Sequence, residues 1–261
     1  MPDITRPPRY RPHTDAALAL ADGRVFRGIG FGEKVNAEGE AVFTTTMTGY
    51  QEVATDPSFR GQIVCMTYPL IGNYGVNPDF DESRQPWIAG MIVREWAADP
   101  SNWRSTGTID AYLRDAGIPG IAGIDTRALT RHIRSVGDTR AVIIQNAAGI
   151  ADEELTPLAL NAVLPGEHGV VDEVKEPDEV TINAAATGPH VVVVDCGVKR
   201  NIVRSLVARN VRVTIVPYGV PYSRIQELDP DGVVVSPGPG DPANLDAGLD
   251  VVRGLLREKR P

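Results

Sequence analysis

The stretch Val233-Val-Val-Ser-Pro-Gly-Pro-Gly-Asp-Pro242 decides the fold of the C-terminal part of this chain. Three β-branched residues followed by alternating proline and glycine predict a buried strand that ends abruptly in a stiff loop. Open α/β sheets bind ligands at the carboxyl ends of such strands. Proline has no N–H donor, whereas glycine lets the backbone approach a ligand closely. We therefore expect Gly238 and Gly240 to offer bare N–H groups to an oxyanion or an amino-acid substrate.

The segments around this stretch predict the opening units of a parallel α/β sheet. Apolar runs indicate strands at 191–195, 211–216 and 232–236, with a helix at about 201–208 between the first two. After the Pro/Gly loop, Leu245, Leu249, Val252 and Leu256 have the spacing of one apolar helix face.

The first 150 residues have a different pattern, which predicts an α+β domain that is β-rich with a few helices. A hairpin is expected at 16–29 around Asp22-Gly23, and further strands and helices follow it. The strands are expected at 41–46, 62–67, 88–93 and 140–144, and the helices at 108–116 and 126–136.

Changes in composition predict four parts of the chain. They are a disordered tail at 1–15, an N-terminal domain at 16–150, an acidic linker region at 151–189 and a partial α/β domain at 190–261.

Composition and charge indicate a globular protein of the cytoplasm. The chain has 261 residues and a formal net charge of −8, which argues against nucleic acid and anionic membranes as partners. Its start has no apolar signal region, and no apolar run reaches transmembrane length. The two cysteines form no disulfide framework, which favours a reducing compartment.

Other candidate motifs do not carry chemistry by themselves. Cys196 ends a predicted strand, but His190 lies on the same strand at about 20 Å, so no cysteine–histidine pair is expected. We interpret Cys196 and Cys65 as inert core thiols. The glycines of Gly28-Ile-Gly-Phe-Gly32 fit a β-turn better than a dinucleotide loop, because no helix follows them. The four histidines have no metal-ligand spacing, so no metal site is predicted.

Six motifs, in this order from about Ala16 onward, carry a resemblance to a known family. They are Phe43-Thr-Thr-Thr-Met-Thr-Gly-Tyr-Gln-Glu52, Thr55-Asp-Pro-Ser58, Thr67-Tyr-Pro-Leu-Ile-Gly-Asn-Tyr-Gly75, Gly123-Ile-Asp-Thr-Arg-Ala-Leu-Thr-Arg131, Asp195-Cys-Gly-Val-Lys-Arg-Asn-Ile202 and Ser236-Pro-Gly-Pro-Gly-Asp-Pro242. Together they resemble the small, glutamine-hydrolysing subunit of carbamoyl phosphate synthetase. The Pro/Gly loop alone would indicate only a class I glutamine amidotransferase, and the N-terminal motifs narrow the resemblance.

The resemblance implies a division of labour between two subunits of a heterodimer. The small subunit hydrolyses L-glutamine through a cysteine thioester, and ammonia passes to a large synthetase subunit. That partner combines it with bicarbonate, using ATP and Mg²⁺, to make carbamoyl phosphate for arginine and pyrimidine biosynthesis. No cofactor is expected in this chain. The resemblance assigns glutamine contacts to Ser58, Gly238 and Gly240, with Gly240 as the oxyanion donor. It also implies that Ser58 reaches the pocket from the N-terminal domain.

The family's catalytic cysteine, histidine and glutamate would fall beyond Pro261, so the resemblance is to a C-terminally truncated form, and the chain alone is expected to be inactive. Three interpretations remain. The favoured one is an incomplete version of an ordinary enzyme subunit. The second is a non-catalytic module that docks on the large subunit. The third, an unrelated amidotransferase, leaves the first 150 residues unexplained.

Overall fold

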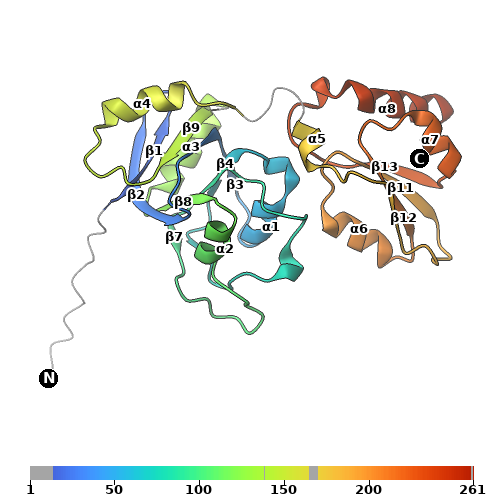
Figure 1. Cartoon of the computed structure of the whole chain (residues 1–261), viewed down its shortest axis with the longest axis horizontal. Coiled ribbons are helices and arrows are strands. Elements are labelled where there is room, and N and C mark those ends of the chain that lie inside the picture. The colour runs from blue at the N-terminus through green and yellow to red at the C-terminus, as the bar shows by residue number, and fades with distance from the viewer. Residues whose placement is uncertain (1–13, 138, 165–169, 260) are drawn as a thin grey trace. The chain divides into compact units, whose positions relative to one another are not determined.

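The computed structural model describes residues 14–137, 139–164, 170–259 and 261, and these form two compact units (Figure 1). Unit 1 comprises the chain up to Thr48 together with Ile63–Val76 and Ala89–Val163, and unit 2 comprises Gly49–Gln62, Asn77–Ile88 and Leu164–Pro261. Most of the tail expected at 1–15 lies outside the described residues. Asp15 does not fit that expectation, because its carboxylate accepts the N–H of Gly30 at 2.8 Å.

Unit 1 is built on a closed barrel, which the expectation of a β-rich α+β domain did not specify. Its strands follow one another around the barrel in the order β1 (Ala16–Leu20), β2 (Val25–Gly32), β8 (Pro119–Ala122), β6 (Gly90–Ile92), β4 (Gln62–Met66), β3 (Ala37–Thr44) and β9 (Thr139–Ile144). The predicted hairpin is confirmed, since β1 and β2 pair antiparallel. A separate parallel pair joins β5 (Leu70–Ile71) and β7 (Glu95–Trp96).

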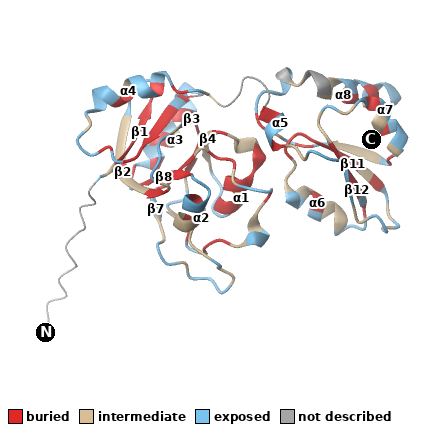
Figure 2. Cartoon of the chain, viewed as in Figure 1, coloured by how far each residue is buried: buried red, intermediate tan, exposed pale blue. Residues whose placement is uncertain are grey.

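Two helices of unit 1 begin where the sequence predicts capping residues. In α2 (Ile109–Asp115), the hydroxyl of Thr108 accepts the N–H of Ala111, and in α3 (Thr126–Val136), Asp125 accepts the N–H of Ala128. The third helix is α4 (Asp152–Leu160). Strand β1 is buried on both faces, as Figure 2 shows. Successive residues of β1 point alternately into two hydrophobic clusters, one of which includes residues of α3 and the other residues of α4.

Unit 2 contains a four-stranded sheet in the order β10 (Val180–Ile182), β12 (Arg212–Pro217), β11 (His190–Asp195), β13 (Gly232–Val235). Strand β11 pairs parallel with both β12 and β13, as predicted. Helix α6 (Arg200–Val207) packs on one face of the sheet, and α7 (Tyr222–Leu228) and α8 (Asp246–Glu258) pack on the other. The unit also contains α1 (Tyr50–Thr55), α5 (Val170–Val174) and the 3₁₀ turns η1 (Pro57–Phe59), η2 (Pro78–Phe80) and η3 (Pro242–Asn244).

Several elements of the structure differ from the expectation. Residues 151–189, expected as an acidic linker region, include α4, α5 and β10, and β10 adds an antiparallel edge strand to the parallel sheet. Helix α7 was not predicted, because its seven residues bury only Tyr222 and Ile225 and give too short a pattern. The functional domain boundaries themselves stay a prediction. Among the described residues, no helix is long and apolar enough to cross a membrane.

Candidate functional site

The carboxyl ends of β11 and β13 form the candidate site, because the order of strands reverses between them. Helix α6 leads from β11 to its neighbour β12 on one face of the sheet, and α7 leads from β12 past β11 to β13 on the other. In open α/β sheets the loops diverge at such a switch point and leave room for a ligand. The Pro/Gly loop at 236–241 follows β13 at this point.

The loop requires glycine at both predicted positions, for different reasons. A Cβ atom on Gly238 would lie 1.9 Å from the carbonyl oxygen of Cys196, so this backbone packs directly on the end of β11. Gly240 has a φ of +81°, which favours glycine. Within the described residues, neither Gly238 nor Gly240 donates its N–H to a protein acceptor. The prediction of a tight loop after a parallel strand, with free glycine N–H groups, is confirmed.

The buried hydroxyl of Ser236 joins the two strand ends. Its Oγ accepts the N–H of Cys196 at 2.9 Å and donates to the carbonyl oxygen of Pro237 at 2.9 Å. The N–H of Ser236 donates to the carbonyl oxygen of Val194 at 3.0 Å, which extends the pairing of β13 with β11 by one bond. The first residue of the loop is therefore fixed to β11 before the chain turns.

The carboxylate of Asp195 organises the loop that follows β11. Its Oδ1 accepts the N–H groups of Gly197 and Val198 at 2.8 and 2.7 Å, and its Oδ2 accepts the N–H of Glu176 at 2.7 Å. Asp195 is 1% exposed, so its charge is stabilised by these three donors in place of water. The carboxylate thus holds both the β11 loop and the segment before β10.

Ser58, which the resemblance expects to reach the pocket from the N-terminal domain, lies in the segment Gly49–Gln62, which packs with the C-terminal segment in unit 2. Asp56 caps the turn by accepting the N–H of Ser58 at 2.9 Å, and Lys199 donates to the same carboxylate at 3.0 Å. A Cβ atom on Gly197 would lie 3.0 Å from Cβ of Pro57 and 3.2 Å from Cα of Gly238. The turn that carries Ser58 and the Pro/Gly loop therefore flank the same glycine.

Two side chains from the segment 77–88 hold elements of the C-terminal segment. Helix α6 has no cap of its own, and Glu82 supplies one: its carboxylate accepts the N–H of Asn201 at 2.9 Å, and its backbone carbonyl accepts the N–H of Arg200 at 2.7 Å. Arg84 donates to the carbonyl oxygens of Glu173, Val174 and Lys175 at the end of α5. No local signal in the sequence indicates these long-range contacts.

The two thiols of the chain have the properties of buried core cysteines. Burial, and then the charge of Asp195, raises the pKa of Cys196 to about 11. Burial raises the pKa of Cys65 to about 12. His190 lies at the opposite end of β11 and bonds through Nε2 to the hydroxyl of Thr214 at 2.9 Å, so it is no base for Cys196. Burial, and then the charge of Arg212, lowers the pKa of His190.

Helix α1 carries a carboxyl group, that of Glu52, whose charged form is disfavoured by its surroundings. Glu52 lies in the sequence motif that ends at this residue, and burial, with the charges of Glu82 and Asp81, raises its pKa despite a hydrogen bond to its own backbone. One carboxylate oxygen of Glu52 is buried and has no hydrogen-bond partner among the described residues. Searched over the residues that the structure describes, the chain has no cluster of three or more side chains suited to a metal ion.

Comparison with known families matches both parts of the chain. Residues 192–261 match the model for glutamine amidotransferase class-I, and residues 18–143 match the model for the carbamoyl-phosphate synthase small chain, CPSase domain. The first match covers β12, β13, most of β11 and the Pro/Gly loop, and the second covers nearly all of the barrel.

Three curated relatives have the same name, carbamoyl phosphate synthase small chain. The protein of Archaeoglobus fulgidus is 46% identical over 92% of this chain, that of Fusobacterium nucleatum is 45% identical over 92%, and that of Listeria monocytogenes is 46% identical over 93%. The chain belongs to the carbamoyl phosphate synthase small chain family. It spans 66%, 66% and 65% of the length of these three relatives.

Proposed function

We propose that this chain forms the glutamine-binding part of the small subunit of a glutamine-dependent carbamoyl phosphate synthetase, the subunit that supplies ammonia to a large partner. The observation that supports this proposal most is the Pro/Gly loop, which lies at the switch point of the sheet. Among the described residues, no protein acceptor takes the N–H groups of its two glycines. Such donors stabilise the negative charge that develops on a carboxamide oxygen when a nucleophile attacks it.

In the proposed site, Ser58, Gly238 and Gly240 contact L-glutamine. Gly240 donates its N–H to the carboxamide oxygen, and Gly238 and Ser58 hold the polar groups of the amino acid. Asp195 and Ser236 act through the backbone: they fix the two loops from which these donors project. The turn at Asp56 fixes Ser58 in the same way.

Hydrolysis of glutamine in this family of reactions requires a nucleophile, a base and an oxyanion hole in one place. This polypeptide supplies donors for the oxyanion, but both of its thiols are buried with raised pKa values, so neither is a thiolate at neutral pH. We propose that residues 1–261 alone do not hydrolyse glutamine.

The proposed partner is the large synthetase subunit, which would bind ATP and Mg²⁺ and use the ammonia with bicarbonate to make carbamoyl phosphate. The product would serve arginine and pyrimidine biosynthesis in the cytoplasm. The alternative function is a non-catalytic module that docks on the large subunit. The two buried thiols favour it for the chain as it stands.

Calorimetry with glutamine distinguishes the two functions. We expect purified chain to bind glutamine, and Ser58→Ala to weaken binding about fivefold, because one neutral hydrogen bond contributes about 1 kcal/mol. Ser223→Ala, an exposed serine on α7, is the matched control. If the folded wild-type chain did not bind glutamine, or if the Ser58→Ala and Ser223→Ala variants bound it equally well, the proposed site would be refuted. Glutamate release above a buffer blank would refute the proposed inactivity.

A further inference from the structure

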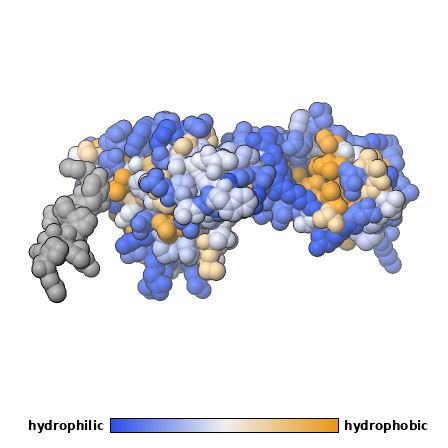
Figure 3. All heavy atoms as spheres, turned by 90° about the horizontal axis from the view of Figure 1, so that it is seen from below, coloured by the Kyte–Doolittle hydropathy of each residue, from blue (hydrophilic) through white to orange (hydrophobic). Residues whose placement is uncertain are grey.

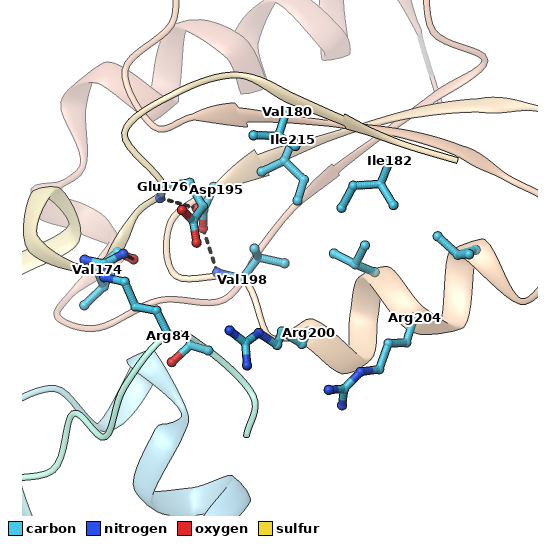
Figure 4. Close-up of a pocket in the computed structure, with 13 residues that line it drawn as sticks. Arg84, Val174, Glu176, Val180, Ile182, Asp195, Val198, Arg200, Arg204 and Ile215 are labelled. Carbon is cyan, nitrogen blue, oxygen red and sulfur yellow. Dashed lines mark hydrogen bonds between the residues drawn. The ribbon is translucent and has the colours of Figure 1, made fainter. Parts of the chain in front are cut away.

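Unit 2 contains a second candidate site, a cavity of about 480 Å³ between the β10 edge of the sheet and α6 (Figure 4). Its volume is in the range of small-molecule binding sites. Its lining does not include Ser58, Gly238 or Gly240. The cavity is therefore separate from the proposed glutamine site, and a ligand bound in it would add to the proposed function.

The two long walls of the cavity are apolar. Val180, Ile182 and Ile215 point from the sheet toward α6 (Figure 4). Val203 and Val207 line the cavity from α6 and belong to the same hydrophobic cluster as Ile182 and Ile215. Val180 is 44% exposed, so apolar surface here remains in contact with water. Figure 3 shows apolar side chains gathered on the α6 side of unit 2. An apolar body that enters between these walls would gain the free energy of removing them from water.

Three arginine residues line the cavity, Arg84 from the segment 77–88 and Arg200 and Arg204 from α6. Arg84 is held by the carbonyl oxygens at the end of α5 and lies 4.8 Å from the ring of Trp87. Among the described residues, the guanidinium of Arg204 has one hydrogen bond, a long one of 3.5 Å to the carbonyl oxygen of Asp81. The guanidinium of Arg200 has no hydrogen bond or ion pair with any described residue. Arg200 therefore has its full donor fork available to a ligand.

The acidic groups of the lining limit the charge of that ligand. Asp195 has its carboxylate committed to three backbone N–H groups, and Glu176 provides the other negative charge. Three guanidinium groups against two carboxylates leave an excess of one positive charge. This excess complements a monoanion better than a phosphate dianion, and a carboxylate matches the guanidinium fork in two parallel hydrogen bonds.

We propose that this cavity binds a small amphipathic carboxylate, with its apolar body between β10 and α6 and its carboxylate on Arg200. The apolar walls select against acetate or inorganic phosphate, and the guanidinium of Arg200 selects against the corresponding alcohol. Because α6 leads from the loop of Asp195, the site shares an element with the Pro/Gly region but no glutamine-contacting residue.

The test titrates the full chain with octanoate, octan-1-ol and acetate, followed by calorimetry and by backbone amide shifts. We expect octanoate to bind at least tenfold more tightly than octanol or acetate, with shifts in β10 and α6. Arg200→Gln should weaken octanoate binding about tenfold, the effect of losing one charge-assisted interaction. Arg209→Gln is the matched control, since Arg209 is exposed at the end of α6 and does not line the cavity.

A second variant tests the apolar wall independently. Val180→Glu places a negative charge at an exposed lining position and should abolish octanoate binding while the circular dichroism spectrum is unchanged. Equal octanoate affinity in the Arg200 and Arg209 variants would overturn the proposal. So would binding of acetate or inorganic phosphate as tight as that of octanoate, or shifts confined to unit 1.

Discussion

Replacing Gly238 by alanine tests whether the Pro/Gly loop packs on β11 as described. The added Cβ would lie 1.9 Å from the carbonyl oxygen of Cys196 and 2.8 Å from its carbonyl carbon. Both atoms belong to the backbone, so the clash cannot be relieved by rotating a side chain. Overpacking of a closely packed site costs about 1–3 kcal/mol, and this rigid contact belongs at the upper end. We expect Gly238→Ala to destabilise unit 2 by about 3 kcal/mol.

Hydrogen exchange measures this loss in each unit separately. At 1.4 kcal/mol per factor of ten, a loss of about 3 kcal/mol speeds exchange about 150-fold for amides that exchange by opening of the unit. The reporters are the buried amides of Val192–Val194 in β11, and those of β1 in unit 1 serve as the internal reference.

Gly232→Ala is the matched control for this experiment. Gly232 begins β13, and the nearest atom to a Cβ there is 3.6 Å away, the carbonyl oxygen of Pro261. Gly232→Ala should change the exchange rates of the β11 amides by less than about fivefold. If alanine reduces the entropy of the unfolded chain, these rates should fall, because the folded state becomes relatively more stable. If Gly238→Ala left exchange in β11 within threefold of the wild type, or speeded β1 equally, the close contact with Cys196 would be refuted.

The environments of two carboxylates and of the two thiols can be tested by substitution, by pH titration of stability and by alkylation. Asp195→Asn should destabilise unit 2 by about 3 kcal/mol, because one amide oxygen cannot accept hydrogen bonds from three N–H donors. If hydrogen exchange showed that the stability of unit 2 fell by less than about 1 kcal/mol, this hydrogen-bond network would be contradicted. The raised pKa of Glu52 means that the folded chain holds the proton more tightly than the unfolded chain, so stability should fall as pH rises above about 4.5. Glu52→Gln should raise the melting temperature at pH 7 and reduce this pH dependence, and an unchanged melting profile would count against it. The pKa is about 11 for Cys196 and about 12 for Cys65, so few of these thiols are thiolates at pH 8. Iodoacetamide at pH 8 should therefore alkylate them in the native chain at least about a hundredfold more slowly than in the denatured chain. Equal alkylation rates by mass spectrometry would show that the thiols are not buried.

The local rules of the sequence determined the elements that lie close to the candidate site. Three valines before Ser236 predicted a strand, and the Pro/Gly alternation predicted its end, because both signals act over a few residues. The expectation that this strand is buried was wrong: β13 lies at the edge of the described sheet, its residues are only partly buried, and Val235 is 43% exposed. The capping residues Thr108 and Asp125 likewise placed the starts of two helices. The motifs also indicated the family, which the comparisons confirm.

Tertiary structure alone decided which segments meet. Glu82 caps α6 from more than a hundred residues away, and the turn of Ser58 lies in unit 2 although its sequence neighbours lie in the barrel. Barrel closure, the β10 edge strand and the cavity at Arg200 are also of this kind. Each depends on contacts between residues far apart in the chain, and no local propensity encodes them. They form because buried N–H groups and apolar faces must find partners once the sheet and its helices are packed together.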